Sequence, residues 1–389
     1  MKSVVRVKLL PTPEQASALA ATLRACNDAA NWLSALAFTQ GRTSRAELQA
    51  LAYVDLRARG LSAQPALHVL RKVADAHAAL KTHVRAGEIG SQGSKRCVRA
   101  VANPIRFRGG AAQPFDDRCL SWQMSAATVS IWTVGGRLKG IAFAGHPEQL
   151  ELLARYRRGE SDLLCRNGEW YLIATCEVPE VEENRRPGGF VGVDLGIVNI
   201  ATTSTGRRHS GRRLNRRREH DRKLRCRLQQ KGTKSAKRRA KRLAGREARR
   251  ARDINHKISK CIVVEAQRTG RGIALEDLTG IRERVRLKKP QRATLHSWAF
   301  RQLGRFIVYK ARRAGVPVVY VDPAHTSQEC SRCHHIDKRN RPSQAVFECR
   351  SCGFVEHADL NASRNIAARG WWMWARGARS VAPVLTPWM

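Results

Sequence analysis

Four cysteines in two C-x-x-C pairs give the strongest chemical signal in this sequence. Cys330 and Cys333 form the first pair, and Cys349 and Cys352 form the second after an interval of fifteen residues. This spacing is typical of a four-thiolate zinc site, in which each pair turns two sulfurs toward one ion. Four unrelated reduced cysteines are the alternative, but two correctly spaced pairs rarely arise together. The sequence therefore predicts one structural Zn²⁺ ion.

Three acids are the second feature that could do chemistry. Asp194 and Glu276 each end an apolar run that is typical of a buried strand, and Asp359 falls in the first turn of an expected helix. Because alternate residues of a strand share a face, Asp194 lies on the side of Gly192, and Glu276 on the side of Ala274. We expect all three acids to converge. The alternative for Asp359 alone is an ordinary partner of the helix dipole.

Clustered carboxylates repel one another unless cations occupy the cluster, and Mg²⁺ is the oxygen-preferring physiological candidate. Two such ions would activate a water and stabilise the leaving oxygen of a phosphodiester. The sequence contains no P-loop, no nucleophile elbow and no H-E-x-x-H motif, so the other common chemistries of acidic sites are disfavoured. Asp194, Glu276 and Asp359 are therefore predicted as catalytic ligands of two Mg²⁺ ions in a nuclease.

The composition favours a polyanionic partner. The 72 Lys and Arg against 32 Asp and Glu give a net charge of +40, which attracts nucleic acid. A membrane surface is the alternative, but no run of eighteen apolar residues and no signal-peptide pattern occurs. The other seven cysteines show no disulfide framework, which suits a reducing, intracellular compartment.

A dense basic segment covers residues 207–252, with enough Leu and Ala for two helices around Lys231-Gly232. A solvated charged helix pair is the alternative, but such a pair would carry more interspersed acids, so contact with phosphates is favoured. The candidate contacts are Arg207, Arg208, Arg212, Arg213, Arg216, Arg217, Arg218, Lys237, Arg238 and Arg239.

The first half of the chain predicts a strand, then helices, then a β-rich region. Residues 2–9 alternate as a strand, and Thr12 with Gln15 forms a capping box for a helix to about Ala37. Further helices are expected over 45–58 and 63–86. From residue 98 to 179, short β-rich runs with an Asn167-Gly168 hairpin turn fit an antiparallel barrel or small sandwich.

The second half alternates strands and helices, as expected for an α/β sheet with insertions. The expected strands cover 190–194, 199–205, 271–278 and 316–321. Besides the basic pair, the expected helices cover 253–267, 297–314 and the stretch after His357. The tail from Trp371 to Met389 is rich in Trp but broken by Pro and Gly, and receives no role.

These motifs together resemble a known family. The stretches GVDLGIVNIATTSTG, ALEDLTGI, TSQECSRC, FECRSCG and HADLNASRNIA resemble the RuvC-type nuclease of the TnpB family, whose transposon-encoded members are similar in core to compact type V CRISPR effectors. The resemblance covers residues 190–370 strongly. The N-terminal strand, the capped helix and the β-rich region resemble that family's wedge domain and inserted recognition helices more weakly.

The resemblance implies a fold class: an α/β RuvC/RNase H-like nuclease domain with an inserted zinc ribbon, plus a β-barrel-like wedge domain with an inserted α-helical recognition domain. The implied domains are a wedge at 1–12 and 96–180, recognition helices at 13–95, a linker at 181–189, a nuclease at 190–325 and 354–370, a zinc ribbon at 326–353, and a tail at 371–389.

It also implies a function, namely RNA-guided cleavage of both strands of a DNA target beside a short motif. The implied partners are a guide RNA and double-stranded DNA, without a membrane, for a monomer on one guide RNA in a prokaryotic cytoplasm, associated with the nucleoid when it acts. Asn361 and Arg364 match the family motif, which implies a supporting or phosphate-contacting role. Three alternatives stay open: a catalytically silent RNA-guided repressor, a conventional transposase, and a zinc-ribbon RNA-binding protein without catalysis.

Overall fold

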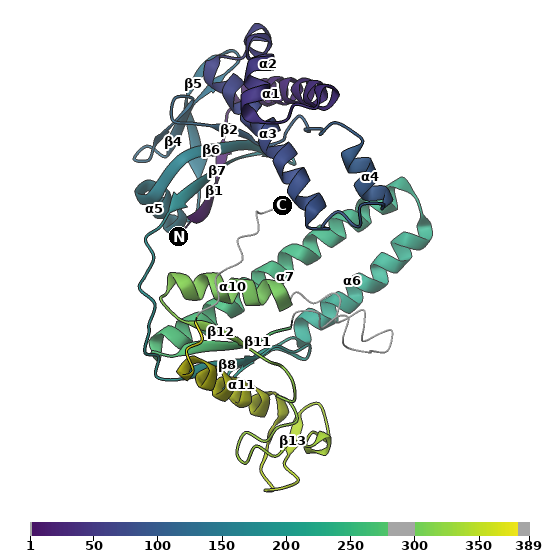
Figure 1. Ribbon diagram of the computed structural model, residues 1–389, viewed down its shortest axis with the longest axis vertical. Helices are drawn as coiled ribbons and strands as arrows, with labels where there is room; N and C mark the ends of the chain where they lie inside the picture. Colours follow the sequence, from purple (N-terminus) through teal and green to yellow (C-terminus); the bar gives the residue numbers. More distant parts are fainter. Residues whose placement is uncertain (1, 279–299, 380–389) are drawn as a thin grey trace. The chain divides into compact units, whose positions relative to one another are not determined.

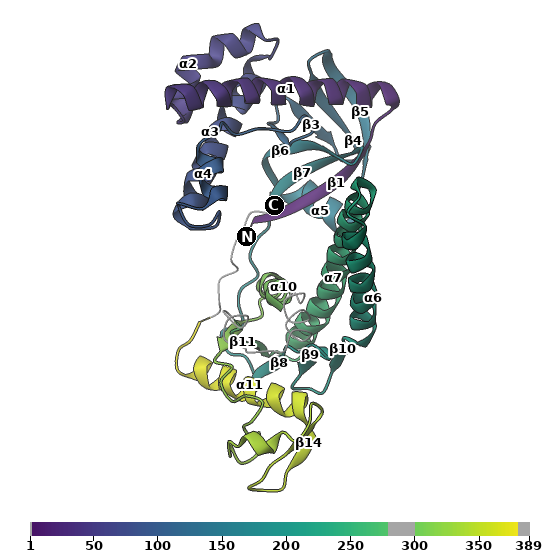
Figure 2. The ribbon, with the colours of Figure 1, turned by 90° about the vertical axis from the view of Figure 1, so that its right-hand side faces the viewer.

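The computed structural model describes residues 2–278 and 300–379, and the chain divides into two compact units, Met1–Pro179 and Glu180–Met389 (Figures 1 and 2). Within the described ranges, no helix is long and apolar enough to cross a membrane.

The first unit contains a curled antiparallel sheet of seven strands in the order β2-β6-β7-β1-β5-β4-β3. Its strands are β1 (Lys2–Leu10), β2 (Gln113–Phe115), β3 (Leu120–Gln123), β4 (Thr128–Thr133), β5 (Gly136–Ala144), β6 (Arg157–Arg166) and β7 (Glu169–Glu177). Phe115 on one edge strand and Leu120 on the other belong to the same core, so the sheet closes on itself like a barrel. Asn167 and Gly168 both have positive φ, as the predicted hairpin turn requires.

A separate helical core lies beside this sheet in the same unit. It is built by α1 (Pro13–Gln40), α2 (Arg45–Ala58) and α3 (Ala63–Arg85). The predicted capping box of Thr12 and Gln15 is present in α1. Two further helices, α4 (Lys95–Val101) and α5 (Pro147–Tyr156), correct the sequence prediction, which extended the β-rich texture across both. Helix α5 also has local signals, with Pro147 at its start and Glu148 in its first turn, and Leu153 is buried against the sheet, so this helix could have been predicted from the sequence.

The second unit is organised by a five-stranded mixed sheet in the order β10-β9-β8-β11-β12. Its strands are β8 (Phe190–Asp194), β9 (Asn199–Thr203), β10 (Arg208–Ser210), β11 (Gly272–Glu276) and β12 (Val318–Val321). Strands β8, β11 and β12 run parallel, whereas β9 and β10 are antiparallel to their neighbours. With the curled N-terminal sheet, the helical region and the four-cysteine element, this arrangement confirms the predicted RuvC-like fold class. The short strand β10 was not predicted.

Helices cover both faces of this sheet (Figure 1). On one face, Val191 and Val193 join a core with α7 (Lys234–Arg268) and α10 (Phe300–Arg313). On the other face, Phe190 and Ala274 pack against α11 (Ala358–Ala375). Alternation along the strands therefore sends Asp194 and Glu276 toward the α11 side, the side predicted from their neighbours.

The basic segment forms an antiparallel pair, α6 (Arg212–Lys231) and α7, joined at Gly232, whose φ is positive. The helix predicted at 253–267 is not separate, because α7 continues through it without a break and carries its C-terminal half onto the sheet. The predicted turn at Gly232 is confirmed.

The structure changes the predicted bounds of the zinc element and of the tail. The zinc element extends to β14 (Val355–His357), which pairs with β13 (Val346–Glu348), and a short 3-10 turn, η1 (Lys338–Asn340), precedes them. The predicted tail also began too early, because Trp371 to Ala375 belong to α11. Residues 297–299 of the predicted helix and 380–389 of the predicted tail lie outside the described residues.

Close approach between β8 and α11 depends on Gly192. A Cβ atom there would lie 2.0 Å from the backbone oxygen of Ser363 and 2.4 Å from the backbone nitrogen of Ala367. We expect Gly192→Ala to lower the thermal midpoint and destabilise the protein by about 1–3 kcal/mol, because backbone cannot yield as a side chain can. The measurement is thermal unfolding of the full chain.

Gly245→Ala is the matched control. It lies inside α7, and its nearest neighbour is the end of the Arg249 side chain at 3.5 Å. Because alanine is the better helix former, this change should be neutral or stabilising by up to about 1 kcal/mol. A Gly192→Ala protein as stable as the wild type would show that α11 does not need this close contact.

Candidate functional site

Two of the three predicted acids lie at the ends of neighbouring parallel strands. Leu275 of β11 is in register with Val193 of β8, so the next residues, Glu276 and Asp194, are neighbours one strand spacing apart, about 4.8 Å between backbones. Glu276 is buried. Its Oε1 accepts a hydrogen bond from Oγ1 of Thr326 at 2.6 Å.

The third acid comes from α11, on the same side of the sheet. Asp359 lies in the first turn of α11 and is buried. Nδ2 of Asn199 donates to its Oδ2 at 2.9 Å, and the Arg341 guanidinium donates to its Oδ1 at 3.1 Å. Both oxygens of this carboxylate are therefore oriented, one by β9 and one by the zinc element.

The electrostatics show that the three carboxylates share one environment. Burial, followed by the negative charges of Glu276 and Asp359, raises the pKa of Asp194 well above its ordinary value, and Arg341 opposes this shift. Burial also raises the pKa of Glu276, against the opposing effects of Thr326, Arg369 and Arg341. Without a bound cation, the site therefore resists full ionisation.

The donor set fits a hard divalent cation, because three carboxylates supply only oxygen ligands. The acids are not gathered around a single point. In the described part of the chain, the group of metal-ligating residues whose ligand atoms all lie within 4.8 Å of one another is the four cysteines. Asp194, Glu276 and Asp359 are residues that would hold Mg²⁺, and Arg341 supplies positive charge beside them.

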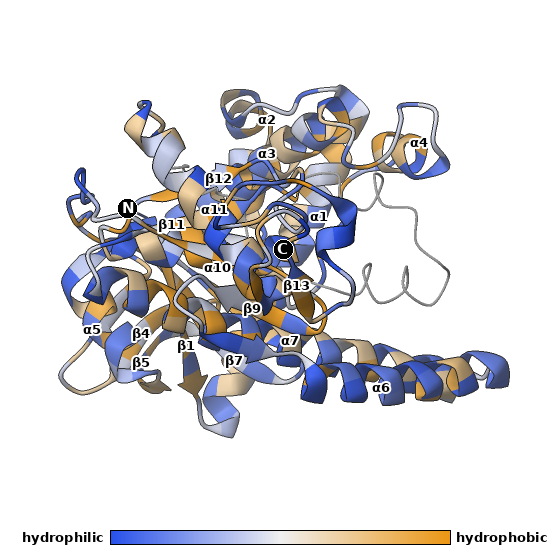
Figure 3. Cartoon of the chain, turned by 90° about the horizontal axis from the view of Figure 1, so that it is seen from below, coloured by the Kyte–Doolittle hydropathy of each residue, from blue (hydrophilic) through white to orange (hydrophobic). Residues whose placement is uncertain are grey.

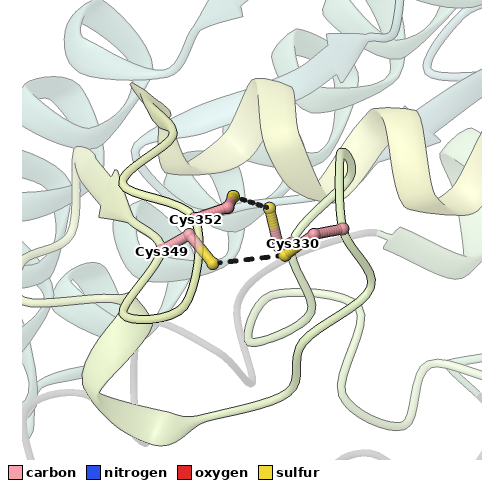
Figure 4. A group of neighbouring side chains, drawn as sticks. Cys330, Cys349 and Cys352 are labelled. Atoms are coloured by element: carbon pink, nitrogen blue, oxygen red, sulfur yellow. Dashed lines mark hydrogen bonds between the residues drawn. The ribbon is translucent and has the colours of Figure 1, made fainter.

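The predicted zinc ligands do converge (Figure 4). The Sγ atoms of Cys330 and Cys352 are 3.8 Å apart, and those of Cys333 and Cys349 are 3.5 Å apart. Four sulfurs placed tetrahedrally at about 2.3 Å from a zinc ion would be about 3.8 Å apart. The geometry therefore fits a closed, structural four-thiolate site.

Local backbone also favours thiolates at this centre. Burial alone would raise the pKa of Cys349, but the backbone N–H groups of Cys352 and Ser351, together with the thiols of Cys333 and Cys352, lower it to about 6. Burial raises the pKa of Cys330, although backbone N–H groups of Cys333 and Arg332 oppose this shift. The backbone N–H of Arg332 points at the sulfur of Cys330, with an N to Sγ distance of 3.4 Å. Each C-x-x-C turn thus directs N–H dipoles toward its first sulfur, which stabilises the charged form that binds metal.

A stripe of three polar residues on α11 joins this zinc element to the helix. Asn361 donates to the backbone oxygen of Glu329 and accepts from the N–H of Ser331. One turn later, Asn365 donates to the backbone oxygens of Thr326 and Glu329. One further turn on, Arg369 contacts the backbone of Asp322 and the carboxylate of Glu329. Residues four apart share a helix face, so the stripe holds the chain segment after β12 against α11.

Both supporting candidates from the sequence have polar partners in the structure. Both ends of the Asn361 amide are used by the backbone of the zinc element, so its place is in positioning α11 rather than in contact with a phosphate. Arg364 pairs with Glu356 at 3.0 Å and is 45% exposed. It therefore lies at the junction of β14 and α11.

The basic hairpin of α6 and α7 separates into structural and available cations. Asp221, which is buried, pairs with Arg217 at 3.3 Å and with Arg250 at 3.1 Å, and so links the two helices. Arg218 is half-buried, and burial lowers the pKa of its guanidinium. Arg217 thus has an ion-pair partner that the sequence pattern did not reveal, although 47% of its side chain is exposed.

The other candidates are exposed as well, and Figure 3 shows mostly hydrophilic residues along α6. Arg207 is 4.0 Å from Glu265. The others form no ion pair with any described residue, and they are Arg208, Arg212, Arg213, Arg216, Lys237, Arg238 and Arg239. Contact with phosphates stays a prediction for this exposed set.

Sequence reasoning missed the three residues that orient the acids: Asn199, Thr326 and Arg341. Asn199 begins the strand after Asp194, a position from which it could have been suspected. Thr326 and Arg341 lie in the irregular zinc element, where no periodicity shows which side chains turn toward the sheet. Their roles depend on how that element docks on α11.

Comparison with known proteins places two family models on the second half of the chain. Residues 174–279 match a model described as "Probable transposase", OrfB_IS605, and residues 300–366 match a Cas12f1-like TNB domain. A CRISPR-associated endodeoxyribonuclease Cas12f1 of Syntrophomonas palmitatica is 34% identical over 220 residues, 52% of this chain and 43% of that protein. A TnpB-like protein of Methanocaldococcus jannaschii is 40% identical over 124 residues, 32% of this chain and 44% of that protein.

The aligned segments thus span less than half the length of each of these two relatives. Among solved structures, the chain is similar to a mini-RNA-guided endonuclease, CRISPR-Cas phi3, with 12% identity and a TM-score of 0.48 over 95% of this chain and 92% of that one.

The four-cysteine site should hold a structural zinc ion on which folding depends. Protein purified without chelator should contain one Zn²⁺ per chain, and Cys330→Ser should lower both folding yield and thermal midpoint, because metal binding at such a site is coupled to folding. Metal analysis and thermal unfolding measure these outcomes. Cys226→Ser is the control, since Cys226 is exposed on α6 and outside the cluster. Protein free of zinc, or a Cys330→Ser variant equal to the control, would contradict the assignment.

The exposed cations of the α6–α7 hairpin should contact nucleic-acid phosphates. Replacing Arg212, Arg213 and Arg216 with Gln should weaken nucleic-acid binding and reduce the slope of log affinity against log salt by roughly 0.7–0.9 for each phosphate that is no longer neutralised. The measurement is a salt titration of affinity for RNA and DNA.

A charge-matched control lies on the same helix. Arg222 and Lys223 lie beside Glu219, and Arg225 pairs with Glu247, so changing all three to Gln removes equal charge from cations that are already paired. The first triple variant should lose more affinity than this control. Equal slopes in the two variants would show that the exposed face of α6 does not follow a phosphate backbone.

Proposed function

This chain belongs to the TnpB (OrfB_IS605) family, which is related to Cas12f, and from this premise we propose that it is an RNA-guided DNA endonuclease. It binds a guide RNA, reads a short motif beside the DNA target, and hydrolyses both target strands at one RuvC-type site. Relatives are named as CRISPR-associated endodeoxyribonucleases, which supports the class of reaction.

One observation carries the proposal: three acids from β8, β11 and α11 meet on one side of the sheet, in an environment that raises the pKa of Asp194 through burial and the other two charges. A folded chain keeps such an arrangement against its electrostatic cost when the site has a use for cations. Three oxygen-donating carboxylates at strand and helix ends are suited to metal-assisted hydrolysis of a phosphodiester.

The chain's own residues have distinct parts in this site. Asp194, Glu276 and Asp359 would hold two Mg²⁺ ions, which supply an activated water and stabilisation of the leaving oxygen. Thr326 fixes one oxygen of Glu276, and Asn199 fixes one oxygen of Asp359. The Arg341 guanidinium, 3.1 Å from Asp359, reduces the repulsion among the carboxylates.

The remaining parts of the chain take roles in binding under this proposal. The exposed cations of the α6–α7 hairpin contact nucleic-acid backbone, and the zinc element holds α11 in place. The curled sheet of the first unit acts as the wedge, and its helices act as the recognition region that reads the target-adjacent motif. Base pairing with the guide supplies the sequence specificity.

The test is cleavage of a plasmid library with randomised flanks by the co-purified ribonucleoprotein in the presence of Mg²⁺. Asp194→Asn, Glu276→Gln and Asp359→Asn should each reduce cleavage by at least about 1,000-fold, because the three carboxylates act as one unit. Binding of guide and target should persist. Wild-type cleavage should require Mg²⁺ or Mn²⁺ and occur only beside one short motif.

Asp277→Asn is the matched control. Asp277 follows Glu276 directly and is exposed, because alternation along the strand turns it away from the α11 side. This variant should cut at the wild-type rate. Cleavage that persists at that rate in Asp194→Asn would remove the assignment of the acids, and wild-type binding without any cut would favour the repressor alternative.

A further inference from the structure

The C-terminal end of α11 exposes aromatic surface that the proposed reaction does not use. Trp371 is 48% exposed and Trp372 is 57% exposed, and Phe38 is the other exposed large aromatic residue in the described part of the chain. Leaving two indole rings in water forgoes a large stabilisation that burial would provide. Exposed aromatic surface of this kind marks a binding site.

A cavity of about 810 Å³ lies beside these rings. Trp371 and Trp374 line it from α11, and Glu182, Glu183, Arg185, Arg186 and Pro187 line it from the segment before β8. Its volume is within the range of sites that enclose a small molecule or one unit of a polymer. All of these residues belong to the second unit.

The walls of the cavity are held in place by contacts outside it. The backbone N–H of Asn184 donates to the oxygen of Gly315 at 2.8 Å, and its side chain donates to Gly270 at 3.2 Å. On the opposite wall, the Trp374 ring packs against Phe190, with 5.8 Å between ring centroids. The site is therefore formed before a ligand arrives.

The charge of the cavity favours an anionic polymer. Arg185, Arg186 and Arg379 line it, against Glu182 and Glu183, and none of these three arginines forms an ion pair with the described residues. Trp372, the next residue, does not line the cavity, and Arg376 already stacks over its ring at 4.1 Å. Aromatic faces with nearby arginines are the combination by which proteins bind unpaired nucleotides, because rings stack on bases while cations offset phosphates.

We propose that this cavity binds an unpaired nucleotide of single-stranded RNA, with the base against Trp371 and the phosphates near Arg185 and Arg186. Its identity as a guide-RNA segment rests on the proposed function. Trp371 follows Asp359 by twelve positions on α11, which separates the cavity from this carboxylate by about 18 Å along the helix. Under the proposed function, DNA is held for cutting at the carboxylates at the other end of the helix, and on this ground we assign this end to the RNA.

The test is RNA binding by the full chain, stripped of co-purified nucleic acid and assayed without Mg²⁺, so that it does not depend on cleavage. The probe is a fluorescein-labelled single-stranded RNA of mixed sequence, with a 4-thiouridine version for crosslinking. Trp371→Ala should weaken RNA binding about 10-fold, as expected for loss of one stacked base. The crosslink should map to the peptide that contains Trp371 or to the one that contains Arg185.

Trp372→Ala is the control, since it removes the same ring from the next position, which does not line the cavity. It should bind RNA within twofold of the wild type, and both variants should keep the wild-type thermal midpoint. Arg185→Gln with Arg186→Gln gives an independent second variant and should also weaken binding.

Three outcomes would overturn the proposal. One is RNA affinity that is the same in Trp371→Ala, the arginine variant and the control. Another is a crosslink confined to other parts of the chain. The third is that the variants lose affinity for single-stranded DNA but keep their affinity for RNA, which would assign the cavity to a DNA strand. A protein that passes these tests but does not cut DNA would overturn only the proposed function.

Discussion

The contact between α11 and strand β8 is the constraint on which the candidate site depends. Gly192 and Gly370 allow the helix to lie this close to the sheet. A Cβ atom at Gly192 would collide with the α11 backbone, and a Cβ atom at Gly370 would lie 2.5 Å from the Cβ of Ala274 on the neighbouring strand β11. Because the helix lies this close to the sheet, Asp359 in its first turn reaches the acids at the ends of β8 and β11. A wider separation would leave Asp359 apart from the two acids of the strands.

That proximity has an electrostatic cost, and the surroundings of the acids offset part of it. Burial and like charge raise the pKa of Asp194, and Arg341 opposes this shift. Burial also raises the pKa of Glu276, and Thr326, Arg369 and Arg341 oppose that shift. The counter-charges come from the zinc element and from α11 rather than from the strands that carry the acids. The sheet therefore concentrates negative charge, and the inserted element and helix moderate it.

The sequence predicted those parts of the molecule whose determinants are local. The Thr12 capping box, the Asn167-Gly168 turn and the spacing of the four cysteines are short patterns with one dominant physical solution, and each has its counterpart in the structure. Alternation along two strands was enough to place Asp194 and Glu276 on one face. Helix α5 was missed although Pro147 and Glu148 mark its first turn, whereas the single long α7 was missed because packing on the sheet decides how far it runs.

The same distinction applies to the site. Acids at strand ends can be predicted from the strands, but Arg341 and Thr326 reach them from an irregular segment whose course depends on the docking of the zinc element. The sequence also assigned Arg217 to nucleic acid, although Arg217 already pairs with Asp221, a buried acid on the same helix. Composition shows that cations are abundant but does not show which are already paired.

The position of the zinc element in the chain has a physical consequence for the acids. Strand β14 runs directly into α11, and His357, the last residue of that strand, caps the helix by accepting a hydrogen bond from the N–H of Asp359 at 3.3 Å. The backbone N–H of Ser331, between the first two cysteines, is held by Asn361 two residues beyond Asp359. The thiolate centre thus fixes the start of α11 from two directions. A zinc ion there would be structural in its coordination, yet the third acid could not keep its place without the fold that it stabilises.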